Sequence, residues 1–207
     1  MLLLFLNVVQ INKKLDMDLN GNMIIQYGII NLIREGEIKM NKEKLFKRGN
    51  GQIVTYQELI KIIADYIKKD LSADYDITIG TDSQTHSLSR IVEVIAVHKV
   101  GDGGIFFYHS EYRERFRALK EKIVEETSRS LENANGFLDN IELLLLDEDV
   151  DIEKLNLNFH IHCDIGHKGK TKELIKEITN WVESLGYDCL IKPESYTASG
   201  IANKFSK

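Results

Sequence analysis

Alternating apolar and polar positions along the middle of the chain predict three consecutive β-strands. In the segment 77–82, positions 77, 79 and 81 fall on one face of a strand, while positions 78, 80 and 82 fall on the other. Similar alternation covers 90–100 and 105–112, which are separated by the glycine-rich turn 101–104. These patterns predict an antiparallel meander whose first strand ends at the carboxylate of Asp82.

Helical spacing of apolar residues predicts three helices, and a fourth follows a capping signal. Residues 55–69 begin with Thr55 and Glu58, the pair that forms a capping box. The longest pattern covers 113–146, with a break expected at Asn135-Gly136. The other two helices are expected over 170–185, ending before Gly186, and over 196–205, capped by Ser195.

Two further strands are expected over 158–165 and 188–191. Three meander strands followed by right-handed crossovers give a five-stranded mixed sheet in the order 3-2-1-4-5. The predicted fold class is therefore α/β, with helices on both faces of the sheet. Strand four lies parallel to strand one.

Residues 1–39 differ in pattern from the rest, apart from a hairpin signal at Asn20-Gly21. We interpret them as an N-terminal extension that a misassigned start would produce, with Met40 as the alternative start. Upstream of Met40, Glu35-Gly36-Glu37 translates back to a purine-rich run similar to a ribosome-binding site. The competing interpretation is a genuine hairpin packed on the domain, which spans 40–207.

Composition narrows the classes of function. The net charge of the 207-residue chain is -5, so a nucleic-acid partner would need a local basic patch or metal ions to screen its phosphates. Two cysteines, Cys163 and Cys189, form neither a disulfide framework nor a zinc-ligand spacing, which favours a reduced, cytoplasmic protein. No stretch is long enough to span a bilayer, and residues 1–9 lack the basic region of a signal peptide.

Three carboxylates are the candidate metal ligands. Asp82 and Asp164 each stand at the carboxyl end of a strand, and these strands are expected to be neighbours, about 4.8 Å apart. Glu126 falls on or beside the apolar stripe of the longest helix, where it either faces the site or is solvated at the edge of the stripe. Oxygen ligands of this kind suit Mg²⁺ or Mn²⁺.

The order of these elements and acids resembles the ribonuclease H-like superfamily, and more closely the YkuK-type family of predicted ribonuclease H-like nucleases. The resemblance covers about residue 52 to the end, and the segments 80–84, 163–166, 169–171 and 192–195 carry it. It implies metal-dependent hydrolysis of phosphodiester bonds in RNA or DNA, with Asp82, Glu126 and Asp164 as catalytic ligands.

Such nucleases often carry a further acid on the last helix, where this chain has Asn203, a neutral and weaker ligand. The alternative function is therefore a non-catalytic module on the same fold that binds nucleic acid or protein through a degenerate metal site. The sequence does not indicate an oligomeric state.

Several residues near the acids are candidates for substrate binding. Lys168 and Lys170 lie where a helix start would meet a backbone phosphate. The remaining candidates are Ser83, Gln84 and Lys192, although Ser83 also fits a turn residue that orients Asp82.

Rival motifs fit less well. The pattern His160-x-His162-x-Asp164 is typical of zinc hydrolases, but no histidine follows His167. We interpret His160 and His162 as half-buried strand residues, or His162 as a neighbour of Asp164. Gly166 to Thr171 lacks the first glycine of a nucleotide-binding loop.

Overall fold

The computed structural model describes residues 15–17, 23–25 and 44–206, except for the side chains at 15–17, 23–25, 198, 199, 203 and 206. The chain divides into two compact units, Met1–Glu43 and Lys44–Lys207, which are considered separately. In the first unit, β1 (Leu15–Met17) pairs antiparallel with β2 (Met23–Ile25). This confirms the two strands of the expected hairpin, although Asn20-Gly21 itself lies outside the described residues. Whether residues 1–39 belong to the natural protein stays a prediction.

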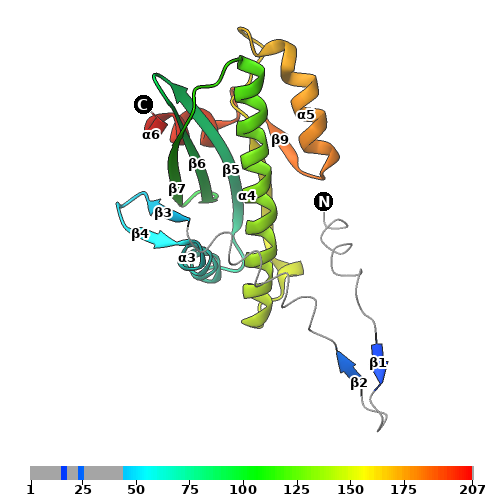
Figure 1. Cartoon of the computed structure of the whole chain (residues 1–207). Coiled ribbons are helices and arrows are strands. Elements are labelled where there is room, and N and C mark those ends of the chain that lie inside the picture. The colour runs from blue at the N-terminus through cyan, green and yellow to red at the C-terminus, as the bar shows by residue number, and fades with distance from the viewer. Residues whose placement is uncertain (1–14, 18–22, 26–43, 207) are drawn as a thin grey trace. The chain divides into compact units, whose positions relative to one another are not determined.

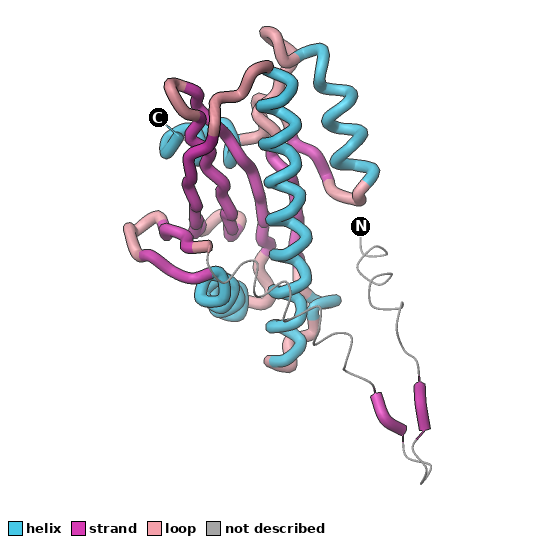
Figure 2. Tube along the Cα trace, viewed as in Figure 1, coloured by secondary structure: helices cyan, strands magenta, loops and turns pink. Residues whose placement is uncertain are grey.

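The second unit is built on a seven-stranded mixed sheet (Figures 1 and 2). Its strand order is β4-β3-β7-β6-β5-β8-β9, so the prediction of five strands and of the complete order is wrong. The five predicted strands do follow one another in the expected sequence from β7 to β9, and β8 runs parallel to β5. The strands are β3 (Leu45–Arg48), β4 (Ile53–Thr55), β5 (Asp74–Thr85), β6 (Ser89–Lys99), β7 (Gly104–Arg113), β8 (Asn156–His162) and β9 (Asp188–Leu190).

The two unexpected strands form a short hairpin that extends the sheet beyond β7. β3 pairs with both β4 and β7, and Phe46 and Val54 bury their side chains while their neighbours Leu45 and Ile53 stay exposed. Gly51, with φ +94°, completes the turn between the strands in a conformation that favours glycine.

Helices cover both faces of the sheet, as predicted. They are α3 (Tyr56–Lys68), α4 (Leu119–Asp147), α5 (Ile175–Ser184) and α6 (Asn203–Ser206), with 3₁₀ turns η2 (Ile152–Lys154) and η3 (Lys172–Leu174) and the π-helix η4 (Thr197–Ala202). Figure 1 shows α4 lying across the strands, with α5 beside it and α6 behind the sheet.

Helix α3 begins where the capping signal in the sequence predicts. The Thr55 hydroxyl accepts a hydrogen bond from the Glu58 amide, and the Glu58 carboxylate accepts one from the Thr55 amide, which completes the capping box. Ile63 and Ile67 of α3 are fully buried in the same core as Ile77 and Ile79 of β5. Burial of each such side chain contributes about 1.5–3 kcal/mol, which fixes α3 on the sheet.

Helix α4 differs from the prediction in two ways. α4 begins at Leu119 rather than at residue 113, because β7 continues to Arg113, and it passes through Asn135-Gly136 without a break. Tertiary packing outweighs the weak helix propensity of that pair, since Ala134 and Phe137 on either side are completely buried.

The last segment covers the other face of the sheet, but not as the single helix expected over 196–205. The π-helix η4 continues directly into α6, and Ala202 packs against Val92 and Val94 of β6. The Phe205 ring stacks on Tyr108, with ring centroids 4.1 Å apart. This packing holds the C-terminal segment against β6 and β7, next to β5, the strand that carries Asp82.

Candidate active site

The parallel pairing of β5 with β8 brings two of the predicted acids to one edge of the sheet. Gly80 lies opposite His162, so Asp82 and Asp164 each stand two residues further along. The predicted parallel pairing of their strands is confirmed, but the strand ends differ, since β5 continues past Asp82 to Thr85 and β8 ends at His162, before Asp164. The hairpin turn expected after Asp82 is shorter than predicted, because β5 continues to Thr85 and Ser83 is therefore a strand residue.

A lysine of α4 joins two of the carboxylates. The Lys122 ammonium lies 3.0 Å from Glu126 Oε1, one helical turn along, and 3.4 Å from Asp82 Oδ1. Asp82 is only 4% exposed and Glu126 6% exposed, so the alternative of a solvated Glu126 at the edge of the stripe is wrong. Two buried carboxylates thus share the positive charge of one lysine.

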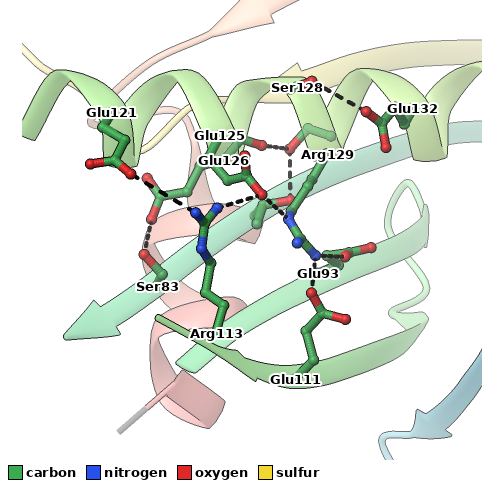
Figure 3. Close-up of polar contacts among 12 residues, drawn as sticks. Ser83, Glu93, Glu111, Arg113, Glu121, Glu125, Glu126, Ser128, Arg129 and Glu132 are labelled. Atoms are coloured by element: carbon green, nitrogen blue, oxygen red, sulfur yellow. Dashed lines mark hydrogen bonds and ion pairs between the residues drawn. The ribbon is translucent and has the colours of Figure 1, made fainter. Parts of the chain in front are cut away.

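Ser83 is a further hydrogen-bond partner of Glu126. Its hydroxyl is buried and donates a hydrogen bond of 2.7 Å to Glu126 Oε1 (Figure 3). Glu126 also lines a small pocket together with Asp164. The other residues of that pocket are Thr81, Ile123, Thr127, Ser130, His162, Cys163 and Ile165. Glu126 is therefore associated with both aspartates: it shares Lys122 with Asp82, and it lines the pocket together with Asp164.

The protonation of Glu126 is strongly affected by its surroundings. The pKa of its carboxyl is raised to about 7, mainly by burial and also by the nearby Asp82, while Lys122 and Ser83 oppose the change. Burial also opposes the charge on Lys122, but Glu126 and Asp82 outweigh that effect and raise the pKa of the ammonium. Near neutral pH the pair therefore combines a charged lysine with a carboxyl that can gain or lose a proton.

Asp164 has a different lysine as its partner. The Lys192 ammonium lies 2.9 Å from Asp164 Oδ1, and the Lys192 side chain is half exposed. The backbone supports this pair, because the Lys192 amide donates to the Ile165 carbonyl at 2.8 Å. The predicted substrate-binding role of Lys192 is untested, and in this structure its charge faces Asp164.

The donor set fits a hard divalent cation, although no ligand shell is assembled. Among the residues that the structure describes, no three His, Cys, Asp or Glu side chains are placed to hold a metal ion together. However, the Lys122 ammonium shows that a cation is already accommodated between Asp82 and Glu126, and carboxylate oxygens are the ligands preferred by Mg²⁺ and Mn²⁺. That Asp82 and Glu126 bind such an ion in place of the ammonium stays a prediction.

The histidines of β8 give no support for the zinc alternative within the described part of the chain. His162 is buried, and its Nδ1 accepts a hydrogen bond of 3.0 Å from the Thr197 amide of η4. Burial and, to a lesser extent, His160 lower the pKa of His162 to about 4, so the ring is neutral at pH 7. The interpretation of His162 as a neighbour of Asp164 agrees with their shared pocket.

A network of charged residues fixes α4 to the sheet beside the site (Figure 3). The Arg129 guanidinium contacts carboxylates on three elements: Glu93 of β6 at 3.0 Å, Glu111 of β7 at 2.5 Å and Glu125 of α4 at 2.8 Å. Lys44 also pairs with the buried Glu93. The network holds the stretch of α4 that positions Glu126, which directly follows Glu125.

Helical periodicity places Lys122 and Arg129 on the polar face of α4, but their side chains are only 24% and 21% exposed and contact carboxylates of the sheet. A signal was present in each case, since Lys122–Glu126 and Glu125–Arg129 are opposite charges four residues apart. Such spacing identifies a pair along the helix, but not that the pair also contacts the sheet.

The remaining predicted site residues are less closely associated with the acids. Lys168 and Lys170 are exposed in the segment between β8 and η3, and Gln84 is partly exposed near the end of β5. The side chain of Asn203 lies outside the described residues. Roles for these four residues in binding stay predictions.

The fold and the acids at the edge of its sheet define a class of protein that sequence comparison confirms. The family model described as "Ribonuclease H-like" matches residues 58–207, and the chain belongs to this family. It is 36% identical over 159 residues to the protein "Uncharacterized protein YkuK" of Bacillus subtilis (strain 168), covering 74% of this chain and 92% of that relative. This similarity places the chain in the YkuK-type branch. No solved structure gives a significant match. None of the described helices is both long enough and apolar enough to cross a membrane.

Proposed function

We propose that this protein hydrolyses phosphodiester bonds in RNA or DNA with Mg²⁺ or Mn²⁺ held by Asp82, Glu126 and Asp164. The observation that carries the proposal is the buried cation position between Asp82 and Glu126, which Lys122 fills in this structure. Membership of the ribonuclease H-like family supports a nuclease-like domain. A cytoplasmic location is part of the proposal, because the two cysteines of the chain form no disulfide framework in the sequence.

The bound metal would lower the pKa of a water molecule and neutralise charge on the phosphate. The chain's own groups would prepare the site. Ser83 holds Glu126 in a fixed orientation, and Lys122 compensates the negative charge of the paired acids. With a pKa of about 7 in the absence of metal, Glu126 can release its proton at neutral pH as the cation arrives. We assign contacts with the backbone phosphates to the exposed Lys168 and Lys170.

The test is cleavage of labelled single- and double-stranded RNA and DNA, an RNA–DNA hybrid and a four-way junction by the full chain. Each reaction is run in Mg²⁺, Mn²⁺ and EDTA. Cleavage that requires metal and is lost in Asp82→Asn, Glu126→Gln and Asp164→Asn supports the proposal. Cleavage that persists in all three variants, or in EDTA, refutes it.

Two matched control variants test whether a loss of cleavage comes from the site itself and not from removing a negative charge elsewhere on the protein. Glu132→Gln changes an exposed glutamate of α4 whose side chain contacts only its helical neighbour Ser128 among the hydrogen bonds described. Asp74→Asn changes an exposed aspartate at the opposite end of β5 from Asp82. Both controls are expected to retain full activity.

A specific observation favours a second candidate, a non-catalytic module that binds nucleic acid or protein. Lys122 pairs with Asp82 and Glu126, and Lys192 pairs with Asp164. The negative charge of these acids is thus compensated by lysines without a metal ion. On this alternative, isothermal titration detects only weak Mn²⁺ binding, and Asp82→Asn binds the nucleic-acid panel as tightly as the unmodified chain does.

A further inference from the structure

The two cysteines lie side by side at the end of the sheet next to the candidate site. Cys163 follows β8 and Cys189 lies within β9, and their sulfur atoms are 3.7 Å apart. β8 and β9 are parallel, with Ile161 opposite Cys189, and the Cys163 amide donates to the Leu190 carbonyl at 2.9 Å. Cys163 is therefore a diagonal neighbour of Cys189 on the same face of the sheet.

Their separation is close to that needed for a covalent bond. Sulfur atoms in a disulfide are about 2.05 Å apart, so the two thiols must approach by roughly 1.6 Å. Diagonal neighbours on adjacent strands have Cα atoms about 7–8 Å apart, slightly more than the roughly 4.4–6.8 Å usual in disulfides. Closure therefore needs side-chain rotation together with a small shift of the chain at Cys163, which lies just beyond the end of β8.

The two thiols differ in a way that assigns them different parts in oxidation. Cys189 is partly exposed, and its contact with the Cys163 thiol lowers the pKa of Cys189. Cys163 is buried. Cys189 is thus the thiol that an oxidant can reach, and the Cys163 sulfur, 3.7 Å away, is positioned to resolve its oxidised form.

We propose that Cys163 and Cys189 form a reversible intramolecular disulfide when a peroxide oxidises Cys189. The Cys189 thiolate attacks one peroxide oxygen, the O–O bond breaks, and a sulfenic acid and hydroxide are formed. The Cys163 sulfur then attacks the Cys189 sulfur, and the S–OH oxygen leaves as water with the proton from Cys163. In total, two thiols lose two electrons and two protons, and the peroxide becomes two water molecules.

The location of this bond links it to the acidic pocket. Cys163 lines the pocket together with Glu126, and Asp164 is the next residue in the chain. The segment after Cys189 carries Lys192, the partner of Asp164. The disulfide joins these two segments and closes residues 164–188, including α5, into a covalent loop. Oxidation therefore restrains the part of the pocket wall that carries Asp164.

The proposal is tested on the full chain without any assay of nuclease activity. The protein is treated with hydrogen peroxide, alkylated with iodoacetamide and mapped by mass spectrometry without reduction. We expect peptides containing Cys163 and Cys189 to be linked with the loss of two hydrogen atoms, and both thiols to be alkylated again after dithiothreitol. Closing a loop of this length should also raise the melting temperature by roughly 5–10 °C.

Three results would overturn the proposal: alkylation of both thiols after peroxide, irreversible oxidation of Cys189 alone, or links only between separate chains. In Cys163→Ser, a dimedone probe should trap a sulfenic acid on Cys189. In Cys189→Ser, the buried Cys163 should stay unmodified in the folded protein, and equal reactivity of Cys163 there would contradict the assigned order. Since the mapping of the unmodified chain requires no variant, a variant that fails to fold does not affect the test.

Discussion

Replacing Glu126 with glutamine should stabilise the metal-free protein, and only at high pH. The unfolded chain ionises this carboxyl near its ordinary pKa of 4.5, whereas the folded protein does so at about 7. The folded state therefore binds the proton more tightly, and its stability from this group is fully present below pH 4.5. That stability is lost as the pH rises through 7.

The size of the effect follows from the difference between the two pKa values. At about 1.36 kcal/mol for each pH unit, the interval from 4.5 to 7 corresponds to up to roughly 3 kcal/mol of unfolding free energy. Glutamine has the shape of the protonated glutamate and still accepts hydrogen bonds from Ser83 and Lys122. We therefore expect Glu126→Gln to match the unmodified chain near pH 4.5 and to exceed its stability by about 2–3 kcal/mol at pH 8.

The measurement is urea unfolding in EDTA between pH 4.5 and 8.5, followed by circular dichroism and by fluorescence of the single tryptophan, Trp181. The difference between variant and parent is the informative quantity, because His162 contributes equally to both. With its folded pKa lowered to about 4, His162 makes each protein lose stability as the pH falls below 6.5.

Glu132→Gln is the control, since an exposed glutamate on the same helix should change stability by less than about 0.5 kcal/mol at every pH. A difference between Glu126→Gln and its parent that stays constant across the pH range would refute the reasoning. A variant less stable than its parent at pH 8 would refute it as well. Either result would mean that the Lys122 and Ser83 contacts outweigh the cost of burying the ionised carboxylate.

Three further predictions concern other parts of the structure. Lys122→Met leaves Asp82 and Glu126 without their shared ammonium and should lower the free energy of unfolding by about 3–5 kcal/mol at pH 8 in EDTA. Added Mn²⁺ should restore part of this loss, and unchanged urea unfolding would contradict the prediction. Thr55→Ala removes the capping hydroxyl and should cost about 1 kcal/mol, whereas Thr55→Ser, tested by the same unfolding measurement, should cost much less. Gly104→Ala places a methyl group 2.6 Å from the Val97 carbonyl oxygen and should lower the free energy of unfolding by roughly 1–3 kcal/mol. The control is Gly200→Ala, where the added carbon meets nothing within 4 Å, and its thermal unfolding should show no such loss.

Local sequence rules were sufficient for the central part of the fold. Alternation identified β5, β6 and β7, and the capping box identified the start of α3. The right-handed crossover rule then placed β8 beside β5, which is why Asp82 and Asp164 could be assigned to one edge before any coordinates were known. These signals depend on residues close in sequence or on a rule that holds for nearly all sheets.

The missed features depend on contacts between distant segments. β3 contains Lys47 and Arg48 and has a single buried residue, Phe46, so its pattern is indistinguishable from that of a polar turn. Its strand conformation comes from pairing with β7, about sixty positions later in the chain. In the same way, Lys122 looks like a solvated helix residue until β5 places Asp82 beside it. Periodicity states which face of a helix is apolar, but not which polar residue another element will cover.

We expect the short edge strand β9 to separate from the sheet before the other strands do. β9 has three residues and hydrogen bonds to β8 alone in the described sheet, so it belongs to the part of the molecule that opens at the lowest free energy. Lys192 lies two residues after its end, and separation of β9 from β8 would carry this lysine away from Asp164 while the strands that hold Asp82 stay intact. Amide hydrogen exchange should therefore be faster in β9 than in β5, and the charge at Asp164 would be exposed each time this edge opens.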